Sequence, residues 1–170
     1  MTLDLKNLDQ ATRNQMVAEI QADRANGLIY HSKYLTHDGR LHWDTLLLEA
    51  AEQHDSAWLA QQMVEHQLVV PEILTQDKRG FTQRTPMKPE DLADSEFNRY
   101  YIRGLCRRAI EEHVPQVITY RAKPVRNPSS EVGIAFDPAD LLLDLRNHRL
   151  RTRNAVPSNP NSGISVRLPE

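Results

Sequence analysis

One stretch, residues 94–126, constrains the fold of this chain more than any other. Asp94 or Ser95 can accept a hydrogen bond from the first free backbone N–H groups of a helix. Pro115 is expected to stop that helix, because the residue before a proline disfavours helical geometry. Residues 117–125 then alternate between two faces, as side chains do along a β-strand. The stretch therefore predicts a long helix that leads directly into a strand.

Two stripes of side chains run along the predicted helix at a spacing of four residues, which places each stripe on one face. The apolar stripe consists of Phe97, Tyr101, Leu105 and Ala109. The basic stripe consists of Arg99, Arg103 and Arg107. Gly104 lies between them and costs the helix about 1 kcal/mol relative to alanine, unless another element packs closely against it.

The basic stripe has two interpretations. In the first it is a solvated face whose ion pairs with neighbouring glutamates contribute about 0.2–0.5 kcal/mol each. In the second it is an interaction face, which Arg121 and Lys123 on the following strand would extend. Arginine is preferred for planar pairing with carboxylates and phosphates. Its partner would be another protein, a second copy, a nucleic acid or the acidic first half of this chain.

The first half of the chain has helical patterns. We expect a helix over residues 10–26 with Asp9 as its cap, a second helix capped by Asp44 and a third capped by Asp55 or Ser56. Residues 31–42 are interpreted as a loop. Residues 75–90 are polar and interrupted by glycine and proline, so we interpret them as a linker or surface loop.

The second half ends in three further segments. Residues 132–136 alternate as a second strand, and Asp137-Pro138 is a typical start for a helix rich in leucine. Residues 149–170 are basic and rich in proline and asparagine. We expect them to form an extended arm that orders mainly against a partner, with residues 164–168 as a strand that completes a sheet in this domain or in a neighbouring copy.

These patterns predict an α+β fold. It has a helical N-terminal half, a helix–strand–strand–helix unit in the C-terminal half and an extended C-terminal arm. Residues 1–148 are expected to form a single domain, since a chain of 170 residues is one domain by default and can bury a sizeable core.

Composition limits the cellular compartments in which the protein is expected. The sequence has no run of about 18 apolar residues, so no membrane association is expected. Its first residues lack the apolar core of a signal peptide. The single cysteine, Cys106, excludes an internal disulfide and is expected to be a buried structural residue. We therefore expect a cytoplasmic protein, or one that is assembled into a particle.

Candidate catalytic chemistry is confined to a histidine-rich segment. It contains His31, His37 and His42 with Asp38 and Asp44, residue types that bind divalent metals. Their spacing matches no metal-binding pattern, and loop histidines beside helix-capping aspartates explain it equally well. No glycine-rich phosphate loop is present. We expect no metal, no cofactor and no catalytic residues.

Three functions remain open. The first is a non-enzymatic structural protein that docks onto the protein subunits of a larger assembly, or onto copies of itself; a phage or phage-like particle is one example. The second is a nucleic-acid-binding accessory protein, and the third is a metal-dependent enzyme at the histidine segment. The interaction residues expected for the first two are Arg99, Arg103, Arg107, Arg121, Lys123, Arg149, Arg151 and Arg153.

Overall fold

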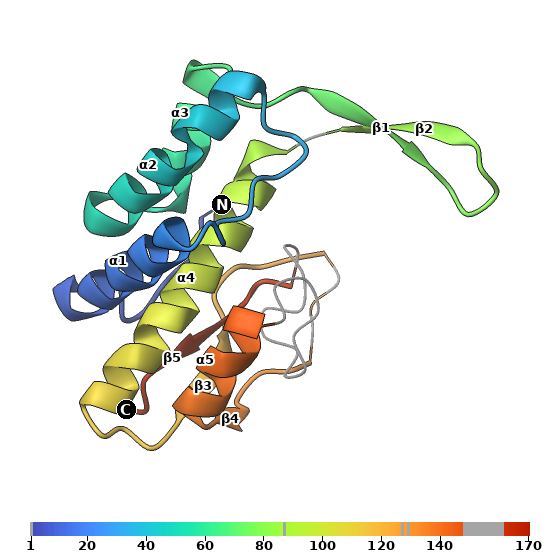
Figure 1. Cartoon of the computed structure of the whole chain (residues 1–170). Helices are drawn as coiled ribbons and strands as arrows, with labels where there is room; N and C mark the ends of the chain where they lie inside the picture. The colour runs from blue at the N-terminus through green and yellow to red at the C-terminus, as the bar shows by residue number, and fades with distance from the viewer. Residues whose placement is uncertain (1, 87, 127, 129, 148–161) are drawn as a thin grey trace.

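A computed structural model describes residues 2–86, 88–126, 128, 130–147 and 162–170 (Figure 1). Within these residues the chain has five helices and two small antiparallel sheets, an α+β fold with a helical N-terminal half, as predicted. The helices are α1 (Gln10–Ala25), α2 (His37–Gln53), α3 (Ser56–Glu65), α4 (Pro89–Glu111) and α5 (Pro138–Asn147). The strands are β1 (Glu72–Gln76), β2 (Thr82–Pro86), β3 (Val117–Arg121), β4 (Ala135–Phe136) and β5 (Ile164–Arg167).

Helix α4 is the centre of the fold and contacts the other four helices and β5 (Figure 1). The whole apolar stripe predicted on this helix is buried, and so is Cys106. Tertiary packing explains the glycine in the middle of this helix, because a Cβ at position 104 would lie 2.8 Å from the backbone nitrogen of Met16 on α1. The two helix backbones therefore approach each other at Gly104 more closely than any other residue would allow.

Two of the predicted helix starts are confirmed by their caps. The carboxylate of Asp9 accepts from the N–H of Thr12 at the start of α1. The carboxylate of Asp55 accepts from the N–H of Trp58 at the start of α3. Both contacts satisfy backbone donors that the first helical turn leaves without partners.

Two other helix starts were predicted too late in the sequence. Helix α2 begins at His37, where Thr36 caps it by accepting from the N–H of Gly39, so the second half of the predicted 31–42 loop is helical. Helix α4 begins at Pro89, a residue favoured in the first turn because its missing N–H is not needed there. Asp94 and Ser95 consequently lie inside the helix.

The helix–strand–strand–helix unit is confirmed as α4, β3, β4 and α5. Strand β3 is the middle of a three-stranded sheet, with β4 on one side and β5 on the other. Ile164 and Val166 of β5 are fully buried. The last strand therefore completes the sheet of its own chain, which is one of the two alternatives expected for residues 164–168. The arm predicted from residue 149 onward stays a prediction, because residues 149–161 lie outside the described residues.

The segment predicted as a linker or surface loop, residues 75–90, contains regular strand structure instead. Strands β1 and β2 pair in register from Glu72↔Pro86 to Gln76↔Thr82 and form a two-stranded hairpin. In Figure 1 this hairpin extends away from the helices. In the described part of the chain, no helix has the length and apolarity to cross a membrane.

Candidate interaction surface

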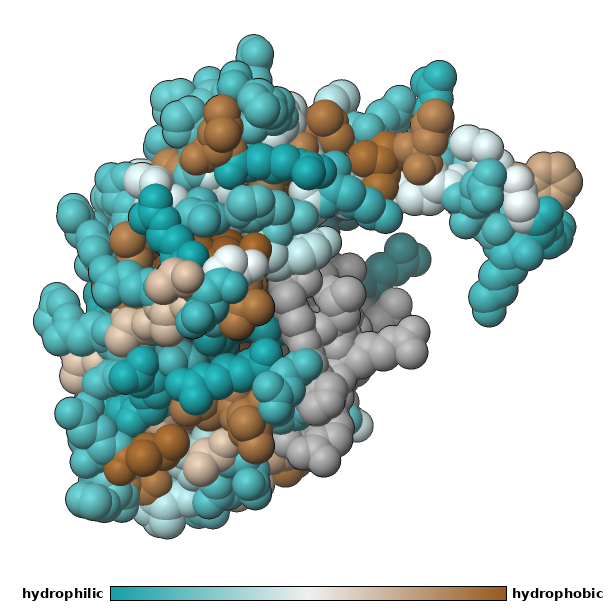
Figure 2. Space-filling model, viewed as in Figure 1, coloured by the Kyte–Doolittle hydropathy of each residue, from teal (hydrophilic) through white to brown (hydrophobic). Residues whose placement is uncertain are grey.

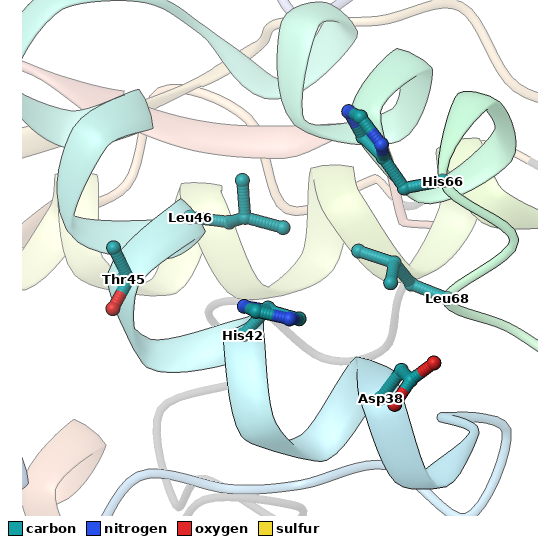
Figure 3. Close-up of a pocket in the computed structure, with 6 residues that line it drawn as sticks. All are labelled: Asp38, His42, Thr45, Leu46, His66 and Leu68. Atoms are coloured by element: carbon teal, nitrogen blue, oxygen red, sulfur yellow. The ribbon is translucent and has the colours of Figure 1, made fainter.

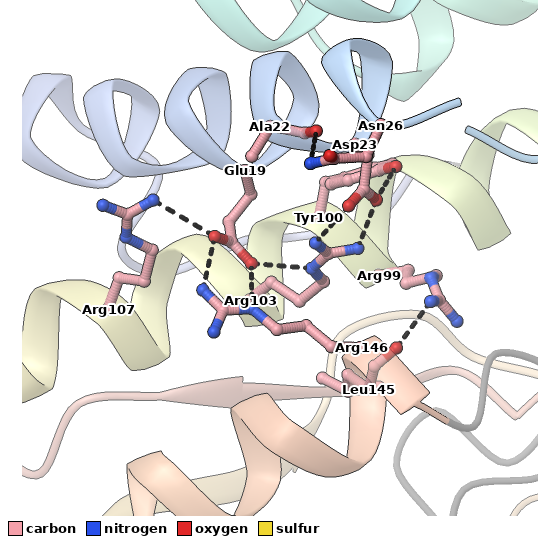
Figure 4. Close-up of polar contacts among 10 residues, drawn as sticks. All are labelled: Glu19, Ala22, Asp23, Asn26, Arg99, Tyr100, Arg103, Arg107, Leu145 and Arg146. Carbon is pink, nitrogen blue, oxygen red and sulfur yellow. Dashed lines mark hydrogen bonds and ion pairs between the residues drawn. The ribbon is translucent and has the colours of Figure 1, made fainter. Parts of the chain in front are cut away.

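The basic stripe of α4 faces the interior at its centre (Figure 4). Arg103 is 2% exposed. Its guanidinium donates to Glu19 at 2.9 Å and to both carboxylate oxygens of Asp23 at 2.7 and 3.0 Å. It also lies 4.8 Å from the centre of the Tyr100 ring, whose hydroxyl donates to Asp23. Arg103 therefore joins α4 to α1.

Glu19 on α1 is the shared acceptor of this cluster. Arg107 donates to it at 3.1 Å, and Arg146 on α5 donates to both of its oxygens at 2.7 and 2.9 Å. Burial alone would raise the pKa of the Glu19 carboxyl. Hydrogen bonds from Arg146 and Arg103 and the charges of both outweigh burial and lower that pKa from 4.5 to about 2. Glu19 is thus charged at neutral pH and connects three helices.

The other predicted interaction residues have different environments. Arg99 is buried and donates to the carbonyl of Leu145. Lys123 is bound to Asp94, and Arg121 is half-buried beside Ser162. The remaining three predicted residues, at positions 149, 151 and 153, lie outside the described residues.

The structure therefore brings part of the predicted set together, but around a carboxylate of the same chain. This is the alternative in which the arginines pair with the acidic first half. Arg99 and Arg103 are inaccessible to a partner, whereas a role for Arg107, Arg121 and Lys123 in binding stays a prediction. Sequence reasoning missed Glu19 and Asp23, although their four-residue spacing on one helix matches the spacing of the arginine stripe.

A surface of a different kind is formed by the β1–β2 hairpin. Its turn is specified by Asp77, whose carboxylate accepts from the backbone N–H groups of Arg79 and Phe81. Gly80 has a φ of +84°, a conformation that glycine adopts readily. Midway along the ribbon the Thr75 and Thr85 hydroxyls are 2.8 Å apart. The hairpin thus has a defined conformation of its own.

The hairpin carries exposed apolar and basic side chains. Leu74 is 70% and Phe81 64% exposed, and apolar atoms are visible along the projecting ribbon in Figure 2. Arg79 lies 5.6 Å from the centre of the Phe81 ring. Lys78 and Arg84 are also exposed. Among the described elements, the strands pack substantially only against each other, so this surface is open to a partner.

Sequence reasoning missed the hairpin because its residues are mostly polar. A signal was nevertheless present. Residues Asp77 to Gly80 are a turn sequence, and threonines on both sides of it favour strands.

The histidine segment is distributed over two places. His31 lies 2.7 Å from Asp44 and forms a pair with it. His42 contributes with Asp38 and His66 to a hollow of about 370 Å³, in which Figure 3 shows the two imidazoles on opposite walls. Within the described residues, no three His, Cys, Asp or Glu side chains are grouped as metal ligands would be. An enzyme at this segment stays an untested hypothesis.

Comparisons of the chain with family models, with curated proteins and with solved structures find no match.

Proposed function

We propose that this chain is a non-enzymatic assembly protein that docks onto the protein subunits of a larger complex through its β1–β2 hairpin. The observation that carries the proposal is the hairpin itself, which is a defined ribbon that projects from the helical body and exposes Leu74 and Phe81. The docking residues differ from the arginine stripe expected from the sequence, because the centre of that stripe is used inside the chain.

The physical support for the proposal is that the hairpin has a defined conformation although it buries little apolar surface. A lone two-stranded ribbon is at best marginally stable in water. Its strands contribute no fully buried side chain to the core. A partner that covers Leu74 and Phe81 would supply the apolar burial that the ribbon lacks, at about 25 cal/mol per Å².

The composition of the ribbon also suits a protein partner. Aromatic residues and arginine are enriched among the side chains that dominate binding energy at protein interfaces. Phe81 and Arg79 are such a pair at the turn, and Arg84 lies directly across from Leu74. The edges of the ribbon also offer backbone groups to an added strand.

Replacement of residues 73–85 by Asn-Gly tests the proposal. Glu72 and Pro86 are already paired, so a two-residue turn closes the ribbon at its base. The expected result is a shortened chain whose melting temperature changes little but which no longer enters the high-mass complex formed by the full chain in its own cells. The mass of the native species in cell extracts, measured by sedimentation, is the readout.

A Leu28→Ser variant is the matched control, since Leu28 is 65% exposed and lies outside the hairpin. It should enter the complex normally. The proposal is refuted if the shortened chain is folded and enters the complex as well as the full chain does.

Nucleic-acid binding is the second candidate, and the same hairpin favours it. The DNA major groove admits a two-stranded ribbon, and Lys78, Arg79 and Arg84 could reach phosphates. Three such contacts would give a log–log salt slope of about −3 for duplex binding. Tight salt-dependent binding that is lost in the shortened chain would support this candidate over protein docking.

A further inference from the structure

We infer that the hairpin of one copy docks into a groove between α3 and α4 of a second copy, so that the chain assembles head to tail. This inference rests on the proposed function and names the partner as the chain itself.

The receiving groove is a hollow of about 430 Å³. It lies between α3, the first turns of α4 and the N-terminal segment. Ala57, Ala60 and Val64 of α3 supply an apolar wall. Val64 is 57% exposed, whereas Ala60 is 5% exposed. The groove therefore has an apolar wall whose outer part, at Val64, is open to a partner.

The border of the groove is acidic. Glu65 at the end of α3 and Glu90 at the start of α4 are both exposed. Asp94 lies deeper and is bound to Lys123. Among the described residues that line the groove, none is lysine or arginine. The surface thus combines apolar wall atoms with the two exposed carboxylates of Glu65 and Glu90, of which Glu65 also accepts from the side-chain amide of Gln61.

The hairpin turn has the complementary chemistry. Phe81 provides an exposed ring, and Lys78 and Arg79 provide two exposed cations beside it. The carboxylate of Asp77 accepts from the backbone N–H groups of the turn and lies 3.8 Å from the Arg79 guanidinium, which is 81% exposed. Solvent screens an ion pair of this kind, so Arg79 stays accessible to a second carboxylate. Phe81 would contact the apolar wall while the two cations face the glutamates, and opposite charges of this kind set orientation and partner choice.

The geometry argues against docking within a single chain. Five-residue strands extend the ribbon by roughly 17 Å, and Figure 1 shows it directed away from the body from which it starts. The turn is therefore kept away from the groove of its own chain. Because ribbon and groove are different surfaces, their contact is heterologous, and repetition generates a ring or an open filament.

Sedimentation of the full chain at increasing concentration tests the inference. The wild type is expected to form species larger than a monomer. A hairpin variant, Arg79→Glu with Phe81→Ser, and a groove variant, Val64→Gln with Glu65→Lys, are each expected to weaken association by at least about thirtyfold, the effect of losing one dominant interface residue. Leu28→Ser should associate like the wild type.

Mixing the two variants gives the sharper result. The hairpin variant retains a native groove, and the groove variant retains a native hairpin. Head-to-tail docking predicts that the equimolar mixture forms a dimer and stops there, because only one of the two interfaces is intact. Circular dichroism and melting temperatures of each variant verify that both chains are folded.

Each other outcome overturns the inference in a distinct way. A wild type that stays monomeric at every concentration excludes self-docking, yet leaves the proposed function to be decided by the hairpin replacement in cells. A groove variant that assembles normally excludes the α3–α4 groove as receptor. Two folded variants that fail to form the mixed dimer exclude the head-to-tail arrangement.

Discussion

Arg103→Met is expected to destabilise the fold severely while changing little of the surface. The substitution keeps a long, unbranched side chain in a position that is 2% exposed. It removes one donor contact to Glu19 and two to Asp23. Asp23 would retain the hydroxyl of Tyr100, and Glu19 would retain Arg107 and Arg146.

The expected loss follows from the charge left behind in the core. Removing one partner of a buried ion pair costs about 3–5 kcal/mol, because the remaining charge is desolvated without compensation. A domain of this kind is stable by roughly 5–15 kcal/mol in total. Adding Asp23→Leu to Arg103→Met should restore part of the loss, since both charges are then absent.

Urea unfolding at pH 7 measures these free energies by linear extrapolation. Arg79→Met is the matched control, because that side chain is 81% exposed and its pairing with Asp77 should contribute less than about 1 kcal/mol. If Arg103→Met costs no more than this control, the assignment of the arginine stripe to the core is wrong, and an exposed interaction face regains support.

Three further predictions concern the fold. Because the pKa of Glu19 is lowered in the folded state, its contribution of up to about 3 kcal/mol is complete above pH 4.5 and is lost as the pH falls toward 2; a Glu19→Gln variant should be less stable at pH 7 and should lack this part of the acid dependence of unfolding. Gly104→Ala should destabilise by about 1–3 kcal/mol despite a better helix propensity, because the added methyl group collides with the backbone of Met16; thermal unfolding measures it, and a more stable variant would contradict the close approach. Deletion of residues 162–170 should remove about 3–6 kcal/mol, since Ile164 and Val166 leave the core; an unchanged denaturation midpoint would show that β5 is dispensable.

The sequence predicts the helices because their signals are local. Asp9 and Asp55 each precede a helix by one residue, and the apolar stripe of α4 has the period of a helix. The predicted starts of α2 and α4 were wrong because more than one residue near each start is suited to begin a helix. Thr36 and Asp44 are both suitable N-cap residues. The earlier one is favoured by tertiary contacts of Thr36 and Gly39 with the Leu68 carbonyl, which no local pattern contains.

The candidate site depends on contacts that no local pattern contains. Arg103 is adjacent to Glu19 only after α1 has packed on α4, a pairing across 84 residues. Likewise, β5 is recognisable as a core strand only through its register with β3. The available sequence signal was the matching four-residue spacing of the arginines on α4 and the acidic residues on α1. This spacing does not indicate which arginine contacts which carboxylate.

Photo-crosslinking from the hairpin turn tests the central claim most directly. A photoreactive phenylalanine analogue replaces Phe81 in chains produced in their own cells, and the same analogue replaces Leu28, whose exposure is nearly equal, in a control chain. Mass spectrometry then identifies the adducts. The account predicts protein adducts from position 81, with peptides of α3 among them if the partner is a second copy, and none above background from position 28. Adducts with nucleic acid alone, or equal yields from the two positions, would contradict it.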